Sequence, residues 1–281
     1  RHCGTLGGKS PRKEQAELSK WLLRTLTELG SRKWISRLAG RFAHSPASRL
    51  LIPRFARVYG IAVEEAEKAI GDYATLNEFF TRRLKPGARP VDDAPGVLVS
   101  PVDARITGMG PIRQGTIFNV KGQDYTIDEL LGFSPRAESY RNGYGIVLYL
   151  SPSDYHRIHS PVDGVVVERH HLPGRVYPVN DFGLTHMPRV LSRNERLVTY
   201  IRHETGETAV VKVGALNVSG IRYADPKADR LSRGGELAWF EFGSTVVLLT
   251  ENGTFEPRSD LSPGAKVRMG EALGRLLQNK S

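Results

Sequence analysis

The spacing of apolar positions changes about a third of the way along the chain. Between residues 14 and 29, and again over 34–42, apolar side chains recur every three or four positions, which predicts amphipathic helices. A third helix is predicted over 50–59, and shorter ones over 63–70 and 76–80. The first part of the chain is therefore predicted to be helical.

Beyond residue 95, short β-branched runs alternate with turns that contain Gly and Pro. The predicted strands are 146–150, 164–167, 197–201, 209–213, 237–240 and 246–249. Such runs predict a mostly antiparallel sheet or barrel. A Pro- and Asp-rich segment, 89–95, separates the two patterns. We therefore expect an α+β protein with basic amphipathic helices in 1–90 and a β-rich, barrel-sandwich-like body in 91–281.

The net charge of +10 is concentrated at the N-terminal end. Residues 1–60 hold 13 Lys+Arg against 3 Asp+Glu, and the remaining residues hold 27 of each sign. Basic helices that carry Trp, Phe and Leu suit an anionic membrane surface. A solvated basic face and a nucleic-acid partner are the alternatives. Because the arm has no recognised nucleic-acid-binding motif, we expect no nucleic acid to bind.

The apolar segments are too short to suggest an integral membrane protein. No stretch approaches the ~20 apolar residues of a membrane-spanning helix, and the first thirty residues lack the apolar core of a signal peptide. Cys3 is the single cysteine, which excludes an internal disulfide and a cysteine-based zinc site. We expect a peripheral protein on the cytoplasmic side of the cell membrane.

The run Phe242-Gly243-Ser244-Thr245 lies between two predicted strands. A tight bend or bulge is the ordinary interpretation of a Gly-Ser pair at such a junction. The alternative is backbone chemistry, because Gly243 leaves space for the Ser244 hydroxyl to attack the preceding carbonyl. β-Elimination of the resulting ester would leave dehydroalanine at a new chain end. Hydrolysis of that dehydroalanine would give a pyruvoyl group.

A second group of reactive side chains lies in residues 153–161, where His156 and His159 are three positions apart. A His-x-x-His pair without a clear third ligand is weak evidence for zinc, so we predict no metal site. Ser244, one of these histidines and an aspartate could form a nucleophile, base and orienting group. The α/β-hydrolase elbow is absent, because Val246 stands where its second Gly would be.

The aspartate cannot be chosen from the residues alone. Ser-Pro-Val-Asp occurs twice, ending at Asp103 and at Asp163, and each copy precedes a predicted strand. Asp154 lies within the histidine-containing segment as well. All three therefore remain candidates at this point.

Five motifs, in order, resemble those of one enzyme family, the bacterial phosphatidylserine decarboxylases. They are Leu76-Asn77-Glu78-Phe79-Phe80-Thr81-Arg82-Arg83-Leu84, Ser100-Pro101-Val102-Asp103, Val120-Lys121-Gly122, Asp154-Tyr155-His156-Arg157-Ile158-His159 and Phe242-Gly243-Ser244-Thr245. The family commonly has Leu at the first position of the last motif, where this chain has Phe242. That change keeps the position apolar and precedes the scissile bond.

The resemblance implies a self-processing proenzyme. Asp103, His159 and Ser244 match the family's triad, in which the histidine takes the serine proton and the aspartate orients the imidazole ring. Cleavage between Gly243 and Ser244 would give a β chain, 1–243, and an α chain of 38 residues, 244–281, capped by a pyruvoyl group. The two chains would form a heterodimer, and family members often pair two such units.

The resemblance also implies the substrate, phosphatidylserine in an anionic membrane surface, and the product, phosphatidylethanolamine. The pyruvoyl group made from Ser244 would form a Schiff base with the substrate amine and take up electrons as carbon dioxide leaves. We expect His156 to supply the replacing proton, since a histidine pKa near the working pH suits that task. Lys121 is a candidate for contact with the lipid phosphate.

Two other functions fit parts of the sequence. One is a non-catalytic barrel-sandwich binding or carrier module with a membrane-binding arm, which predicts a continuous chain without a reactive carbonyl. The other is a serine hydrolase, which predicts an intact, labelled Ser244. Both leave the order of the five motifs unexplained.

Overall fold

The computed structural model describes residues 40–113, 116–120, 123–177, 179, 184, 187, 189–215, 220–241 and 244–278, with the backbone alone described for 116–120 and 244. The helix predicted over 14–29 and most of that predicted over 34–42 lie outside these residues, as do Lys121 and Gly243.

A small helical unit precedes the body. Its elements are η1 (Pro46–Leu51), α3 (Ile52–Tyr59), η2 (Val63–Glu65), η3 (Ile70–Asp72) and α4 (Leu76–Phe80). They enclose a core of their own in which Ile52 and Phe79 are fully buried. The Thr75 side chain caps α4 by accepting the Glu78 N–H at 3.1 Å, which explains why the helix begins there. The helices predicted over 50–59 and 76–80 are therefore confirmed.

The helix predicted over 63–70 is wrong beyond its first turn. Val63–Glu65 forms one 3₁₀ turn, and Ile70 begins the separate 3₁₀ turn η3, but the residues between them are not helical. The next residues pair with an extended segment, because the Glu67 N–H donates to Arg83 O at 2.9 Å and the Lys85 N–H donates to Glu65 O at 2.8 Å. These bonds use backbone groups that a longer helix would need internally.

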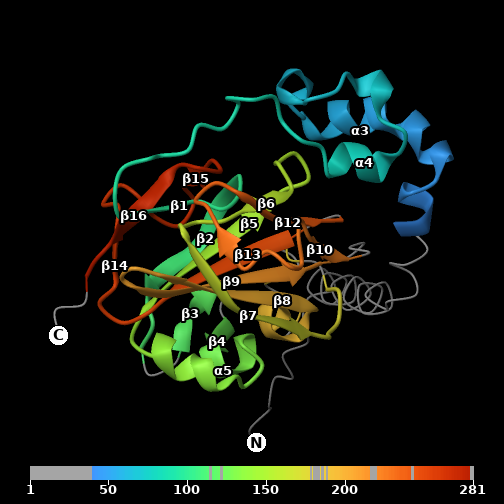
Figure 1. The fold of residues 1–281 in the computed structure, drawn as a ribbon. Coiled ribbons are helices and arrows are strands. Elements are labelled where there is room, and N and C mark those ends of the chain that lie inside the picture. The colour runs from blue at the N-terminus through green and yellow to red at the C-terminus, as the bar shows by residue number, and fades with distance from the viewer. Residues whose placement is uncertain are drawn as a thin grey trace, which may run out of the picture.

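The body is built on one antiparallel sheet of eight strands, in the order β11-β7-β8-β9-β13-β5-β2-β15 (Figure 1). Its strands are β2 (Ala104–Pro111), β5 (Tyr144–Leu150), β7 (Gly164–Leu172), β8 (Arg196–His203), β9 (Gly206–Gly214), β11 (Arg230–Leu231), β13 (Ser244–Thr250) and β15 (Lys266–Val267). The strands predicted from the β-branched runs are present, and the α+β fold class is confirmed.

In the part of the chain that the structure describes, three smaller sheets accompany this one, in the orders β1-β16-β14, β10-β12-β6 and β3-β4. Their strands are β1 (Val97–Val99), β3 (Thr116–Val120), β4 (Gln123–Thr126), β6 (Arg157–His159), β10 (Ile221–Tyr223), β12 (Glu236–Phe240), β14 (Phe255–Pro257) and β16 (Ala272–Leu276).

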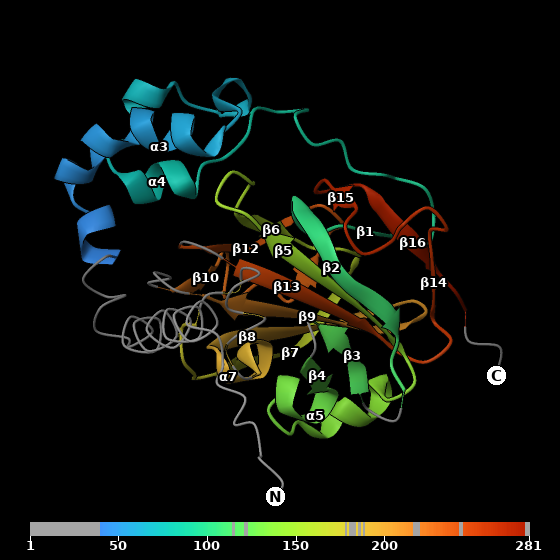
Figure 2. The ribbon, with the colours of Figure 1, turned by 180° about the vertical axis from the view of Figure 1, so that it is seen from behind.

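The central strands are buried on both faces, which explains why their sequences are almost continuously apolar. On β13, Val247 and Leu249 face a core shared with the short helices α5 (Ile127–Leu130), η4 (Pro135–Tyr140) and α7 (Val190–Arg193). Val246 and Leu248 face the opposite core, which the two three-stranded sheets cover. The helical unit and α5 lie at opposite ends of the molecule in both views (Figures 1 and 2).

The two Ser-Pro-Val-Asp motifs form equivalent, mutually paired turns. The Val99 N–H donates to Pro161 O at 3.0 Å, and the His159 N–H donates to Pro101 O at 2.9 Å. In each turn the serine hydroxyl donates to the valine carbonyl two residues later at 2.7 Å. The repeated sequence thus brings His159 next to the turn that carries Asp103.

None of the helices in the described part of the chain is long and apolar enough to cross a membrane.

Candidate active site

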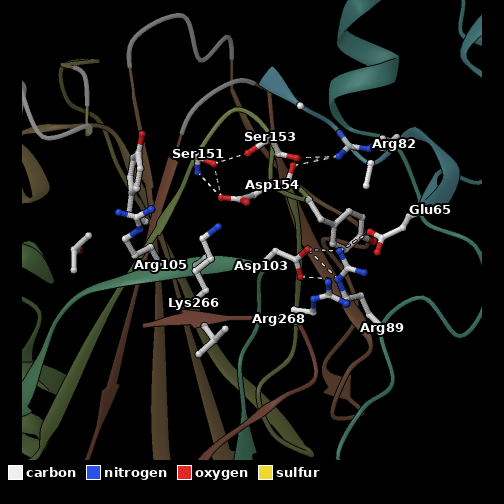
Figure 3. A pocket seen from close by; sticks show the side chains of 17 residues that line it. Glu65, Arg82, Arg89, Asp103, Arg105, Ser151, Ser153, Asp154, Lys266 and Arg268 are labelled. Atoms are coloured by element: carbon white, nitrogen blue, oxygen red, sulfur yellow. Dashed lines mark hydrogen bonds and ion pairs between the residues drawn. The ribbon is translucent and has the colours of Figure 1, made fainter. Parts of the chain in front are cut away.

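A cavity of about 670 Å³ lies where the helical unit meets the ends of β2, β5 and β15. The helical unit and the linker that follows it contribute Glu65, Arg82 and Arg89 (Figure 3). The body contributes Asp103, Arg105, Tyr149, Ser151, Ser153, Asp154, Tyr155, Lys266 and Arg268, among others. Among the described residues, five cationic side chains thus line the cavity against three carboxylates.

Asp103 is held by a guanidinium from the linker. Arg89 Nε donates to both carboxylate oxygens, at 2.8 and 2.9 Å, and the backbone N–H of Met269 donates to Oδ1 at 2.9 Å. Arg89 Nη2 also binds Glu65 Oε2 at 2.8 Å. Burial acts to lower the pKa of Arg89, but the hydrogen bonds and charges of the two carboxylates outweigh it and raise that pKa.

The second aspartate of the repeat also accepts a hydrogen bond from a backbone N–H. Asp163 Oδ1 accepts the Arg233 N–H at 2.9 Å, as Asp103 Oδ1 accepts the Met269 N–H. Asp163 is exposed, whereas Asp103 is buried and faces the cavity. Burial and the contact with Arg89 therefore distinguish two aspartates that the sequence could not.

The His159 ring is held in the tautomer that a base requires. Its Nδ1 lies 2.7 Å from Gly234 O, which can only accept, so the proton is assigned to Nδ1. Nε2 is then the acceptor for the Tyr155 hydroxyl at 3.1 Å. Burial lowers the pKa of His159, while the bond to Gly234 and the charges of Glu236 and Asp103 act in the opposite direction.

The hydrogen bond that fixes this tautomer thus involves Gly234 rather than Asp103. Both oxygens of Asp103 accept from Arg89, and one also accepts from Met269. Asp103 acts on His159 through its charge, which favours the protonated ring. Its orienting role stays a prediction.

His156 is completely buried, and its ring centroid lies 3.9 Å from that of Phe80. Its Nδ1 lies 2.8 Å from Asp154 O, while Nε2 has no partner among the described residues. Burial, reinforced by the charge of Arg82, lowers the pKa of His156 to about 3. This differs from the pKa near the working pH that we expected, because the sequence did not indicate complete burial.

Ser244 begins β13, whose backbone pairs with strands on both sides. Ser244 lies opposite Leu150 of β5 and opposite Gly214 of β9. Leu150 is followed directly by Ser151, which lines the cavity. The predicted start of the α chain is therefore fixed beside the cavity, four residues after Phe240, whose N–H donates to His156 O at 3.1 Å.

The cations of the cavity were missed by sequence reasoning. Arg82 lies within the Leu76–Leu84 motif, but no role was assigned to it. Arg105 follows Asp103 by two residues, and Lys266 and Arg268 lie in a segment to which the sequence analysis assigned no role. Their convergence depends on the pairing of β15 with β2, which no local pattern predicts.

Comparison with known proteins gives a consistent result. The family described as phosphatidylserine decarboxylase matches residues 76–275. The chain belongs to this family. A phosphatidylserine decarboxylase proenzyme of Geobacillus kaustophilus is 44% identical over 257 residues, which cover 92% of this chain and 97% of the relative.

Other relatives agree with this assignment. The proenzyme of Brevibacillus brevis is 43% identical, with 85% of this chain and 92% of the relative covered. That of Bacillus thuringiensis is 41% identical, with 94% and 100% covered. Membership of the phosphatidylserine decarboxylase family confirms the predicted resemblance and the prediction of an enzyme, against a carrier module or a serine hydrolase.

Proposed function

We propose that this protein decarboxylates phosphatidylserine to phosphatidylethanolamine, with a pyruvoyl group made from Ser244 by self-cleavage after Gly243. The observation that carries the proposal is the register of β13, in which Ser244 lies opposite Leu150 at the edge of a cation-lined cavity. The names of the relatives, which are decarboxylase proenzymes, support the same conclusion.

In the cleavage step, His159 serves as the base that receives the Ser244 hydroxyl proton. Its neutral ring with Nδ1–H bound to Gly234 leaves Nε2 available once the Tyr155 hydroxyl moves away. The lowered pKa keeps the ring unprotonated at neutral pH, which a base requires. Asp103 stabilises the imidazolium that forms, through its charge.

The two flanks of the cleavage site are held in different sheets, which suits cleavage without dissociation. On the N-terminal side, β12 pairs with β6 and places Glu236 opposite His159. On the C-terminal side, β13 lies between β5 and β9, β15 pairs with β2, and β16 pairs with β1. The α chain would thus stay bound to the β chain as a heterodimer.

The residues around the start of β13 fit a pyruvoyl group. Two buried polar atoms nearby, His156 Nε2 and Thr245 Oγ1, have no partner in the described part of the chain, and the cavity provides space for a headgroup. A pyruvoyl group supplies a ketone that condenses with an amine and withdraws the electron pair left by a departing carboxylate.

His156 is our candidate for the proton that replaces the carboxylate. With its pKa near 3, the ring is neutral when the cavity is empty. An anionic headgroup in the cavity acts to raise that pKa, which is the direction that lets the ring hold a proton for transfer. The apolar contact with Phe80 keeps water away from this proton.

The helical unit is the proposed membrane contact of a peripheral enzyme. Leu50 and Val58 are 84% and 68% exposed, and Arg54 and Arg57 lie beside them on α3. Exposed apolar side chains next to arginines suit the interface of an anionic bilayer. We propose that this face and the basic residues 1–39 hold the enzyme on the cytoplasmic leaflet. We also propose that two α–β heterodimers associate with each other.

The test is a decarboxylation assay on phosphatidylserine vesicles. We expect the wild-type protein to release carbon dioxide and form phosphatidylethanolamine, and the Ser244→Ala variant to do neither while remaining folded. Equal release by both proteins would contradict the proposal, because alanine at position 244 cannot yield the ketone.

A further inference from the structure

Two like charges face each other directly across neighbouring strands in the cavity. Lys266 of β15 lies opposite Arg105 of β2, and both side chains are exposed on the cavity wall (Figure 3). Like charges at directly opposed positions destabilise a sheet. Across the described ranges of the chain, no carboxylate lies within ion-pair distance of either side chain. Lys266 interacts with the Asp154 carboxylate through charge alone, by acting to lower its pKa, so within the described residues neither cation has an ion-pair partner that offsets the repulsion.

A buried guanidinium in the same cavity is only partly hydrogen-bonded. Arg82 is 4% exposed, and its Nη2 donates to Ser153 O at 3.2 Å. Its Nε and Nη1 have no hydrogen-bond partner among the residues that the structure covers. Burial lowers the pKa of Arg82 without a carboxylate bound to it, and an unsatisfied buried cation is costly. Its charge favours an anion in the cavity.

The paired cations lie in one row with the start of the predicted α chain. Lys266, Arg105, Tyr149 and Thr245 occupy opposed positions on β15, β2, β5 and β13. Neighbouring strands are about 4.8 Å apart, so the backbones at Arg105 and Thr245 are about 10 Å apart. Ser244 adjoins Thr245.

That spacing matches a serine phospholipid headgroup. Four bonds separate its amine nitrogen from its phosphorus, a span of at most about 5 Å. With the amine at residue 244, the long side chains of Arg105 and Lys266 cover the remaining distance. We propose that Arg105 and Lys266, with Arg82 behind them, bind the phosphodiester of the lipid headgroup; this inference rests on the proposed function.

The phosphodiester is favoured over the serine carboxylate for an energetic reason. The carboxylate loses its charge in the reaction, so a cation that binds it stabilises the ground state more than the transition state and slows the step. The phosphodiester keeps its charge throughout the reaction. Cations that bind it therefore stabilise the ground state and the transition state equally. Substrate and product therefore share this contact.

The experiment uses the full chain with Ser244→Ala, so that ligands bind without turnover. It titrates dihexanoyl phosphatidylserine, dihexanoyl phosphatidylethanolamine and inorganic phosphate. The test variant adds Arg105→Gln and Lys266→Gln. The matched control adds Lys227→Gln and Arg275→Gln, which remove the same charge from exposed positions that do not line the cavity.

We expect the test variant to bind both lipids about 10- to 100-fold more weakly than the control, with the same factor for each. In the mature enzyme, the same two substitutions should raise KM with little change in kcat. Loss of phosphatidylserine binding alone would assign the cations to the carboxylate and overturn the inference. Unchanged lipid binding, or inorganic phosphate binding as tightly as the lipids, would overturn it as well.

These outcomes are separate from those of the proposed function. If the wild-type chain were never cleaved, the function would fail whatever the titration gave. If cleavage and turnover were normal but the lipids bound equally to the test and control variants, only the phosphodiester site would fail. A melting temperature of the test variant equal to or above that of the control variant would show that lost binding is not lost folding, since the substitutions remove a repulsion between opposed charges.

Discussion

Replacing Arg89 with methionine removes the central partner of the Glu65–Arg89–Asp103 cluster. Arg89 and Asp103 side chains are 8% and 11% exposed, so the aspartate would remain as a buried charge with only the Met269 N–H bound to it. Removing one partner of a buried ion pair costs about 3–5 kcal/mol. We take about 3 kcal/mol, because the Met269 bond remains and Glu65 is 27% exposed and can be solvated.

The assay is urea unfolding of the Ser244→Ala chain, which keeps the polypeptide in one piece. At roughly 2 °C or more per kcal/mol for a chain of this size, Arg89→Met should also lower the melting temperature by about 6 °C or more. The matched control is Arg83→Met, whose side chain is 59% exposed and 3.4 Å from Glu236. That variant should lose less than about 1 kcal/mol.

The same substitution has a consequence for cleavage when Ser244 is intact. Without the guanidinium, the charge of Asp103 acts more strongly on His159 and raises the pKa of the ring. A larger fraction of His159 is then protonated at low pH, so the cleavage rate should fall at a higher pH than in the wild type. Equal stability of the Arg89 and Arg83 variants, together with identical pH profiles, would refute this reasoning.

Three further predictions address other parts of the molecule. His159→Ala should leave the chain uncleaved on a denaturing gel, whereas His156→Ala should be cleaved but form no phosphatidylethanolamine. Lys212 is fully buried, and burial lowers its pKa well below 10.5. Between the two pKa values the unfolded chain binds a proton that the folded chain lacks. The free energy of unfolding should therefore rise with pH up to about 10.5. Lys212→Met should abolish that rise in urea unfolding, and a rise that persists would contradict the assignment. Leu50→Asp with Val58→Asp should weaken sedimentation with anionic vesicles while leaving the melting temperature unchanged.

The elements that the sequence predicted well are those whose signal is local. The apolar runs of β5 and β13 indicated strands because each alternates its side chains between two cores. The Leu76–Phe80 helix was predicted from its own short apolar run, and the structure shows that it begins at a local capping residue, Thr75. The five motifs were enough to identify the family, because their order is itself specific.

The parts that failed depend on contacts distant in sequence. Residues beyond Glu65 pair with the Arg83–Lys85 segment instead of continuing a helix. The burial of His156, and hence its pKa, comes from packing against Phe80 of the helical unit. A local pattern of residues contains neither of these contacts.

The candidate site illustrates the same division. Asp103 and Asp163 have identical local sequences and identical backbone roles, and only their tertiary surroundings differ. The cross-strand pair Lys266 and Arg105 requires the register of β15 on β2, between residues 161 positions apart in the chain. Candidate nucleophile and bases could thus be named from sequence, whereas the cations around them could not.

The most direct test of the account is the intact mass of the purified, active protein under denaturing conditions. We predict two polypeptides, one of them residues 244–281, lighter by one ammonia than a chain that begins with serine. A single continuous chain in a preparation that converts phosphatidylserine to phosphatidylethanolamine would contradict the account.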